Sequence, residues 1–235
     1  SQKLALNTAL LNPISNEAGY LDNRSKAVNL GVYIADFAYV NLCQDKTYAL
    51  TYFKVIRDLA LKNNIYGCFN DALFNRIQDN LANNDSLVSI SQEMYYNMSD
   101  ILENANRQNM NALITSGVLI ESIYLAVMNV NNDSEHQKNI QKILEQKQLF
   151  DNFYEFISLY KKDKDVKLEL NRLDTLKKTL NKVVVKSTNK IITKDKNNHR
   201  TVKGGQEIIV NETIFKEFKE NIIKVRQEIT SISTK

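Results

Sequence analysis

Apolar residues recur every three or four positions along most of the chain, which is the spacing of one helix face. This periodicity predicts helices over residues 25–42, 45–62, 69–82, 86–104, 108–130, 135–146, 149–160, 166–184 and 212–231. Gly and Pro are scarce inside these segments. We therefore expect an all-α protein, a compact bundle of antiparallel helix pairs. A superhelix of repeated helix pairs is the alternative, although no fixed residue period supports it.

Two of the predicted helices are apolar on nearly every face, namely 25–42 and the centre of 108–130. A helix of this kind is buried in the middle of a fold. Each contains a glycine, Gly31 in the first and Gly117 in the second. Glycine inside a helix costs about 1 kcal/mol relative to alanine, so it usually marks a close approach of two backbones. We expect the two helices to cross at these glycines.

Polar residues interrupt both apolar helices at helical spacing. Asn29, Tyr33 and Asp36 share one face of the first helix, and Glu121 and Tyr124 share a face of the second. A crossing at the two glycines would bring the two carboxylates into one interior neighbourhood. These five residues are the candidate ligand-binding residues of the chain.

The paired carboxylates, Asp36 and Glu121, have a functional and a structural interpretation. An apolar interior raises a carboxyl pKa, and such groups cluster at sites of proton transfer, so the pair and its neighbouring tyrosines could form an enzyme site. The structural interpretation, which we favour, is that both accept hydrogen bonds from Tyr, Asn or Arg, because a buried charge needs partners. Three arginines in the first half of the chain are available for this role: Arg57, Arg76 and Arg107.

Metal and nucleophile motifs are missing from the sequence. The two histidines, His136 and His199, have no partner at ligand spacing, and there is no Cys-x-x-Cys, His-Glu-x-x-His, EF-hand or Gly-x-Ser-x-Gly pattern. We expect neither a metal nor another cofactor. Cys43 and Cys68 lie in apolar surroundings and are expected to be buried thiols rather than a disulfide.

Length and composition limit the class of protein. The 235 residues are 43% hydrophobic and 25% charged, which suits a globular chain, and residues 1–235 are expected to form a single α-helical domain. No run of about 18 uncharged apolar residues occurs, so no membrane span is expected. Tyrosines are concentrated in the first five predicted helices. They could line a ligand pocket, but tyrosines at helical spacing more often pack in the core.

Basic residues are concentrated near the end of the chain. The net charge of +4 hides an acidic first part, where residues 1–135 hold 9 Lys or Arg against 14 Asp or Glu. Residues 186–210 break the helical pattern and predict a basic loop or short β-hairpin, with a mobile linker as the alternative. A binder of anionic polymers would use Lys182, Lys186, Lys190, Lys194, Arg200 and Lys203. No aromatic residue interleaves them for base stacking, so we expect no specific nucleic-acid binding.

Two stretches resemble one known group of proteins. Residues 29–39 read NLGVYIADFAY and residues 115–126 read TSGVLIESIYLA. Both are similar to the signature helices of uncharacterised helical lipoproteins of Bacteroidetes-type bacteria. The resemblance implies an exported protein of the cell envelope, attached to the membrane only through a lipid anchor that has been removed. The first residue is Ser1, as expected both after cleavage of an export signal and in a shortened chain.

The functional prediction is a helical protein that binds a small ligand or a protein partner without catalysis. The alternative is an enzyme that uses an interior site made by Tyr33, Asp36, Glu121 and Tyr124.

Overall fold

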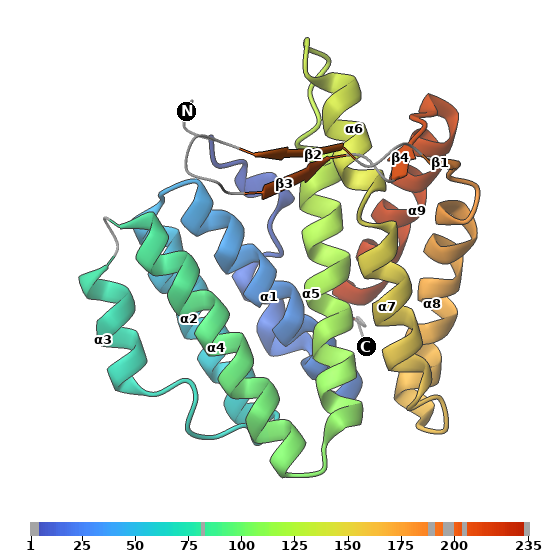
Figure 1. Ribbon diagram of the computed structural model, residues 1–235. Coiled ribbons are helices and arrows are strands. Elements are labelled where there is room, and N and C mark those ends of the chain that lie inside the picture. Colours follow the sequence, from blue (N-terminus) through green and yellow to red (C-terminus); the bar gives the residue numbers. More distant parts are fainter. Residues whose placement is uncertain (1–4, 81–82, 188–190, 195–199, 204–205, 233–235) are drawn as a thin grey trace.

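The computed structural model describes residues 5–80, 83–187, 191–194, 200–203 and 206–232. This part of the chain is helical apart from two short pairs of strands (Figure 1), which confirms the all-α prediction. The α-helices are α1 (Asn23–Leu42), α2 (Lys46–Lys62), α3 (Asp71–Asp79), α4 (Asn84–Asn104), α5 (Gln108–Met128), α6 (His136–Leu144), α7 (Lys147–Ser158), α8 (Lys164–Leu180) and α9 (Glu212–Thr230). They follow two short 3-10 helices, η1 (Thr8–Leu10) and η2 (Ile14–Gly19).

Asp and Asn side chains fix the start of most of these helices. Each accepts a hydrogen bond from a backbone N–H in the first turn, which satisfies a donor that the helix itself leaves unpaired. The capping residues are Asp22, Asp45, Asn70, Asn83, Asp163 and Asn211. Helix α3 is shorter than the predicted helix 69–82, because Asn70 caps its start and the helix ends at Asp79.

The two apolar helices form the centre of the bundle, as predicted. Both α1 and α5 are buried over most of their length, and they pack against each other along it (Figure 1). By length and composition α5 is the one described helix that could cross a membrane, but 67% of its apolar window is buried inside the protein. This burial fits the central helix of a folded bundle.

Two glycines allow the close contact between α1 and α5. A Cβ placed on Gly31 would lie 1.9 Å from the carbonyl oxygen of Ile114, and one on Gly117 would lie 1.9 Å from that of Val28. No side chain larger than hydrogen fits at either position without separating the helices. The crossing predicted from the two glycines is therefore confirmed, and it fixes which faces of α1 and α5 meet.

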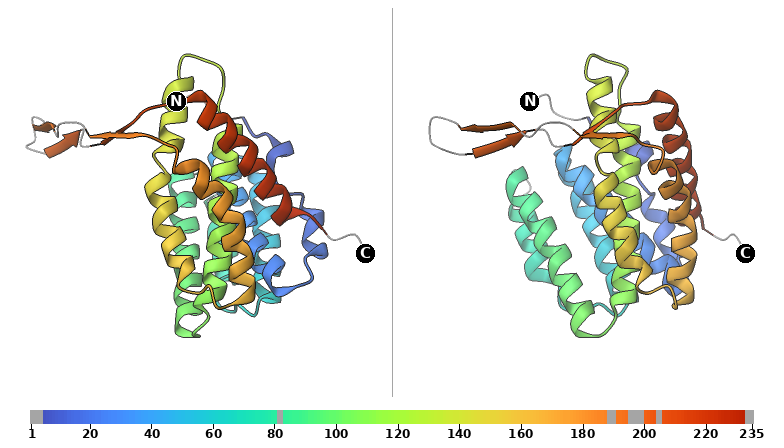
Figure 2. Two further views of the ribbon diagram at one scale, coloured as in Figure 1. Left: turned by 90° about the vertical axis from the view of Figure 1, so that its right-hand side faces the viewer. Right: turned by 45° about the vertical axis from the view of Figure 1, so that its right-hand side comes forward.

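The other helices surround this central pair on two sides. Helices α2, α3 and α4 lie on one side, and α7, α8 and α9 lie on the other (Figures 1 and 2). Buried apolar side chains form one continuous cluster that reaches from Leu10 to Ile229, as a single domain requires. The arrangement is the compact bundle rather than a stack of similar helix pairs. Cys43 and Cys68 are buried and form no disulfide.

A β-ribbon connects α8 to α9. Nearest the bundle, β1 (Val185–Ser187) pairs antiparallel with β4 (Gln206–Ile208). Further out, β2 (Ile191–Lys194) pairs antiparallel with β3 (Arg200–Lys203), and the ribbon projects from the bundle (Figure 2). The hairpin prediction for residues 186–210 is confirmed over these strands. Of the predicted basic residues, Lys190 lies outside the described part of the chain.

Candidate functional site

The polar faces of α1 and α5 meet in the middle of the bundle. Asp36 and Glu121 are completely buried, each with 0% of its surface exposed, and their carboxyl groups lie within hydrogen-bonding reach of each other. Asn29 and Tyr33 of the same α1 face are also completely buried, and Tyr124 is nearly so. The structure therefore brings all five predicted residues into one region, which we call the carboxylate cluster together with Asn12 and Arg226.

An arginine from the last helix neutralises this cluster. Arg226 of α9 donates from Nε to Glu121 Oε2 over 3.1 Å and from Nη2 to Glu121 Oε1 over 3.2 Å. Its guanidinium also lies over the ring of Tyr124, 4.8 Å from the ring centre. A two-pronged contact of this kind is the strong form of an Arg–carboxylate pair. Arg226, which the sequence prediction did not include, is the partner of Glu121.

The three arginines that were predicted as partners lie elsewhere. Arg57 pairs with Asp71, Arg76 pairs with Glu93, and Arg107 donates to the backbone carbonyls of Asn63 and Asn64. That prediction is wrong because it considered the first half of the chain, whereas α9 is the helix that packs across α5 at this level. The usable signal was the position of Arg226 beside Val225 and Ile229, on the apolar face of α9.

The cluster holds the backbone of the segment 10–13, which runs from the end of η1 to the start of η2. The N–H of Asn12 donates to Asp36 Oδ2 over 3.1 Å, and the Asn12 carbonyl accepts from the Tyr52 hydroxyl over 2.9 Å. The Pro13 carbonyl accepts from the Tyr33 hydroxyl over 2.8 Å. Backbone groups outside regular structure need other partners when they are buried, and the side chains of Asp36, Tyr33 and Tyr52 supply them here.

The C-terminal end of α9 is bound through asparagine. Asn29 Nδ2 donates to the carbonyl of Ile229 over 2.8 Å, and its Oδ1 accepts from Asn12 Nδ2 over 3.3 Å. The Tyr20 hydroxyl donates to the carbonyl of Thr230 over 3.1 Å. The predicted site residues thus bind two segments of their own chain, the segment 10–13 and the end of α9.

The surroundings of the two carboxyl groups shift their pKa values to different extents. Burial raises the pKa of Asp36 well above its ordinary value, and the neighbouring negative charge of Glu121 raises it further. Burial also raises the pKa of Glu121, but the Arg226 guanidinium opposes this. Asp36 is therefore the one of the two carboxyl groups that holds a proton to higher pH, because two adjacent ionised carboxylates would repel each other. Asp36 Oδ1 has no hydrogen-bond partner among the described residues.

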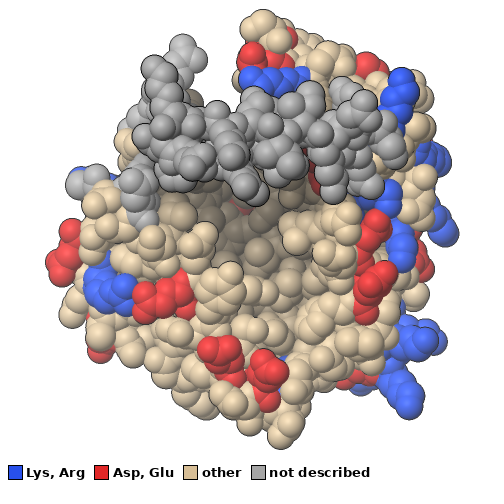
Figure 3. All heavy atoms as spheres, viewed as in Figure 1, with Lys and Arg blue, Asp and Glu red and all other residues tan. Residues whose placement is uncertain are grey.

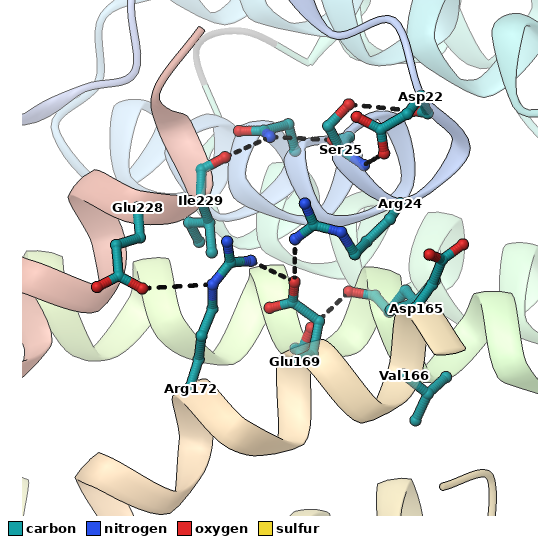
Figure 4. Close-up of polar contacts among 12 residues, drawn as sticks. Asp22, Arg24, Ser25, Asp165, Val166, Glu169, Arg172, Glu228 and Ile229 are labelled. Carbon is teal, nitrogen blue, oxygen red and sulfur yellow. Dashed lines mark hydrogen bonds and ion pairs between the residues drawn. The ribbon is translucent and has the colours of Figure 1, made fainter. Parts of the chain in front are cut away.

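A second buried carboxylate, Glu169 of α8, lies between two arginines (Figure 4). Arg24 of α1 lies 2.8 Å from Glu169 Oε1, and Arg172 contacts the same oxygen. Arg172 also lies 3.4 Å from Glu228 of α9. This network ties three helices together.

Asp36 and Glu121 have no exposed surface in the described part of the chain. The surface pockets found there are lined by other residues, and neither Asp36 nor Glu121 lines any of them. The described residues also contain no group of three or more His, Cys, Asp and Glu side chains that could hold a metal ion. The cluster thus binds and orients protein backbone, and its two carboxyl groups are completely buried.

A different region offers space for a ligand, a groove between α4 and α5 whose floor is α1. Its volume is about 320 Å³. The face seen in Figure 3 is hollowed at its centre over these helices, and uncharged residues make up most of the wall. The lining residues are Ile34, Ala35, Ala38, Asn41, Leu42, Val88, Ser91, Gln92, Tyr95, Tyr96, Val118 and Ser122. We call this region the α1–α4–α5 groove.

Small residues and one cross-link shape this groove. The hydroxyl groups of Tyr95 and Thr115 lie 2.7 Å apart and join α4 to α5 at one end. The floor and sides carry Ala35, Ala38 and Ser122, whose short side chains leave the space unfilled. A further hollow of about 260 Å³ shares these three residues and continues along α1 and α5.

Asn41 is the unusual residue of the groove. It lies in the last turn of α1, and only 2% of it is exposed. Neither its amide oxygen nor its amide nitrogen has a hydrogen-bond partner among the described residues. Buried polar side chains nearly always have partners, so an unpaired one calls for an explanation. The sequence prediction did not include Asn41, although an Asn on a helix that is apolar all round was a visible signal.

Because comparisons with known proteins found no match, the geometry of the cluster and the groove is the evidence for function. No family model matches the chain, and no curated protein or solved structure is significantly similar to it. The resemblance to envelope lipoproteins stays a prediction.

Proposed function

We propose that the protein binds a small neutral molecule in the α1–α4–α5 groove, without catalysis. The observation that carries this proposal is Asn41, a residue that lines an uncharged hollow and whose buried amide has no partner in the described protein. Ligand pockets are commonly 300–1,000 Å³ and mostly apolar, with a few polar groups that orient the ligand. The groove, at about 320 Å³, has these properties.

The proposal moves the ligand away from the five residues predicted for it. Asn29, Tyr33, Asp36 and Glu121 are occupied by backbone or by Arg226, which supports a structural role for the carboxylate cluster. An enzyme that uses Asp36 and Glu121 is the less favoured alternative, because it would need an opening that no described pocket provides.

Native mass spectrometry with a denatured control tests the proposal, together with titration of the neutral apolar dye Nile red. We expect either a copurified mass that is lost on denaturation or saturable dye fluorescence. Ser122→Phe should abolish dye binding, because Ser122 is exposed and its new ring would fill the groove. Asn97→Phe places the same ring at an exposed position of α4 outside the groove and should leave binding unchanged. Equal dye binding by both variants would refute the groove as the site.

Location and partners are further parts of this proposal. The resemblance supports a lipid-anchored protein of the cell envelope, and a protein partner on the helical surface is the second kind of ligand that the sequence predicts. Fractionation of cells that produce the full-length protein tests the location, and recovery in the soluble cytoplasmic fraction would contradict it. Lys182, a predicted contact to anionic polymers, is paired with Glu217 in the structure.

A further inference from the structure

The unpaired amide of Asn41 offers one hydrogen-bond acceptor and one donor side by side. We infer that the α1–α4–α5 groove selects a neutral ligand with a cis-amide edge, such as a lactam, whose C=O and N–H pair with Asn41 Nδ2 and Oδ1. This inference rests on the proposed function and adds the chemical class of the ligand. An amide side chain can both donate and accept, and a cis amide is the complementary group that satisfies both atoms at once.

The charge of the lining argues for a neutral ligand. None of the residues that line the groove or its extension is Asp, Glu, Lys, Arg or His. A charged ligand would lose its hydration here without gaining an opposite charge, which is costly. A ligand with an apolar body would instead contact Ile34, Ala35 and Val118.

Other polar groups of the groove are less suited to set the specificity. The Tyr95 hydroxyl is already bonded to Thr115. Gln92 and Ser122 are exposed and can bond to water, so a missing ligand contact leaves them satisfied. Asn41 alone among the described lining residues is both buried and unpaired, and a ligand that fails to pair with it leaves two polar atoms without partners.

A matched pair of probes tests this inference. Phenanthridin-6(5H)-one is a neutral, fused-ring lactam with adjacent C=O and N–H groups, and its N-methyl derivative lacks the donor. We expect the wild-type protein to bind the lactam about tenfold more tightly than the N-methyl derivative in fluorescence titrations, the loss expected for one unmade hydrogen bond in a buried site. In Asn41→Leu the preference should disappear, whereas Asn97→Leu, at an exposed position outside the groove, should retain it.

The outcomes separate this inference from the proposed function. If Nile red binds in the groove but the two probes bind equally well, or neither binds, the lactam inference is wrong and the groove remains the site. If neither the dye nor the probes bind, both proposals fail. Circular dichroism checks that Asn41→Leu is folded, and Asn41→Ala replaces it if it is not, with the same loss of preference expected.

Discussion

The carboxylate cluster and the α1–α4–α5 groove lie on opposite faces of α1. Asn29, Tyr33 and Asp36 project from one face, and Ala38 and Asn41 project from the other. The cluster is rich in chemistry-bearing groups, but its principal groups contact protein backbone or another side chain. The groove is chemically plain, yet it contains a buried amide without a partner. The difference teaches that a buried polar residue points to a ligand only when the protein itself does not satisfy it.

Removal of the cation from the carboxylate cluster should have the largest effect. Arg226→Met leaves Glu121 buried without its partner and should lower the free energy of unfolding by about 3–5 kcal/mol. Urea denaturation measures this loss. The double variant with Glu121→Met should recover part of it, since the unpaired charge is then gone. A single variant as stable as wild type would show that the cluster does not hold α9.

A methyl group at the crossing of α1 and α5 should destabilise both the carboxylate cluster and the α1–α4–α5 groove. Gly117→Ala places a Cβ 1.9 Å from the Val28 carbonyl, so α1 and α5 must separate, and we expect a loss of about 3 kcal/mol. Gly19→Ala is the control, because there the new Cβ meets only the side chain of Ile232, which can move. Thermal and urea denaturation compare the two. Equal, small losses would contradict the backbone contact at the crossing.

The protonated Asp36 should make stability depend on pH. Its pKa is raised in the folded protein, so its contribution is complete at low pH, below its ordinary pKa, and is lost as pH rises through the raised value. One such group changes the free energy of unfolding by at most about 1.4 kcal/mol per pH unit. Asp36→Asn stays neutral and should lack this loss. Urea midpoints measured from pH 5 to 10 test this, and parallel curves for the two proteins would show that Asp36 is ionised.

Substitution in the groove should have the smallest effect, and the opposite sign. Asn41→Leu removes two unpaired buried polar atoms and should raise the free energy of unfolding by about 1 kcal/mol. Asn29→Leu, in the cluster, removes bonded atoms and should lower it. Denaturation of both variants without ligand tests the contrast. If Asn41→Leu were the less stable of the two, Asn41 would have a structural partner.

Much of the centre of the fold could be predicted from the sequence. Gly31 and Gly117 stand alone in two apolar helices, and this pattern was sufficient to place the crossing and to bring Asp36 near Glu121. The reason is physical, since only a close backbone contact explains a glycine in the middle of a buried helix. Local spacing therefore carried information about a contact between helices far apart in the chain.

The groups that bond to the carboxylate cluster could not be predicted in this way, and neither could the existence of the groove. Asn12 lies in an irregular segment with no periodicity, so nothing in its neighbours indicates that its backbone meets Asp36. The groove exists because α4 and α5 diverge from the loop that joins them (Figure 1), and the angle between two helices is set by packing along their whole length. The spacing of apolar residues along each helix does not determine the angle between α4 and α5.

The ion pair between Glu121 and Arg226 has a consequence for the synthesis of the protein. Arg226 follows Glu121 by 105 positions and follows Leu10, whose carbonyl it also binds, by 216. Helices α1 and α5 leave the ribosome long before their cation does, so the nascent bundle contains an uncompensated carboxylate until α9 emerges. A chain released before that helix would keep this defect and be exposed to chaperones and proteases. The cluster thus couples the stability of the bundle to the synthesis of α9.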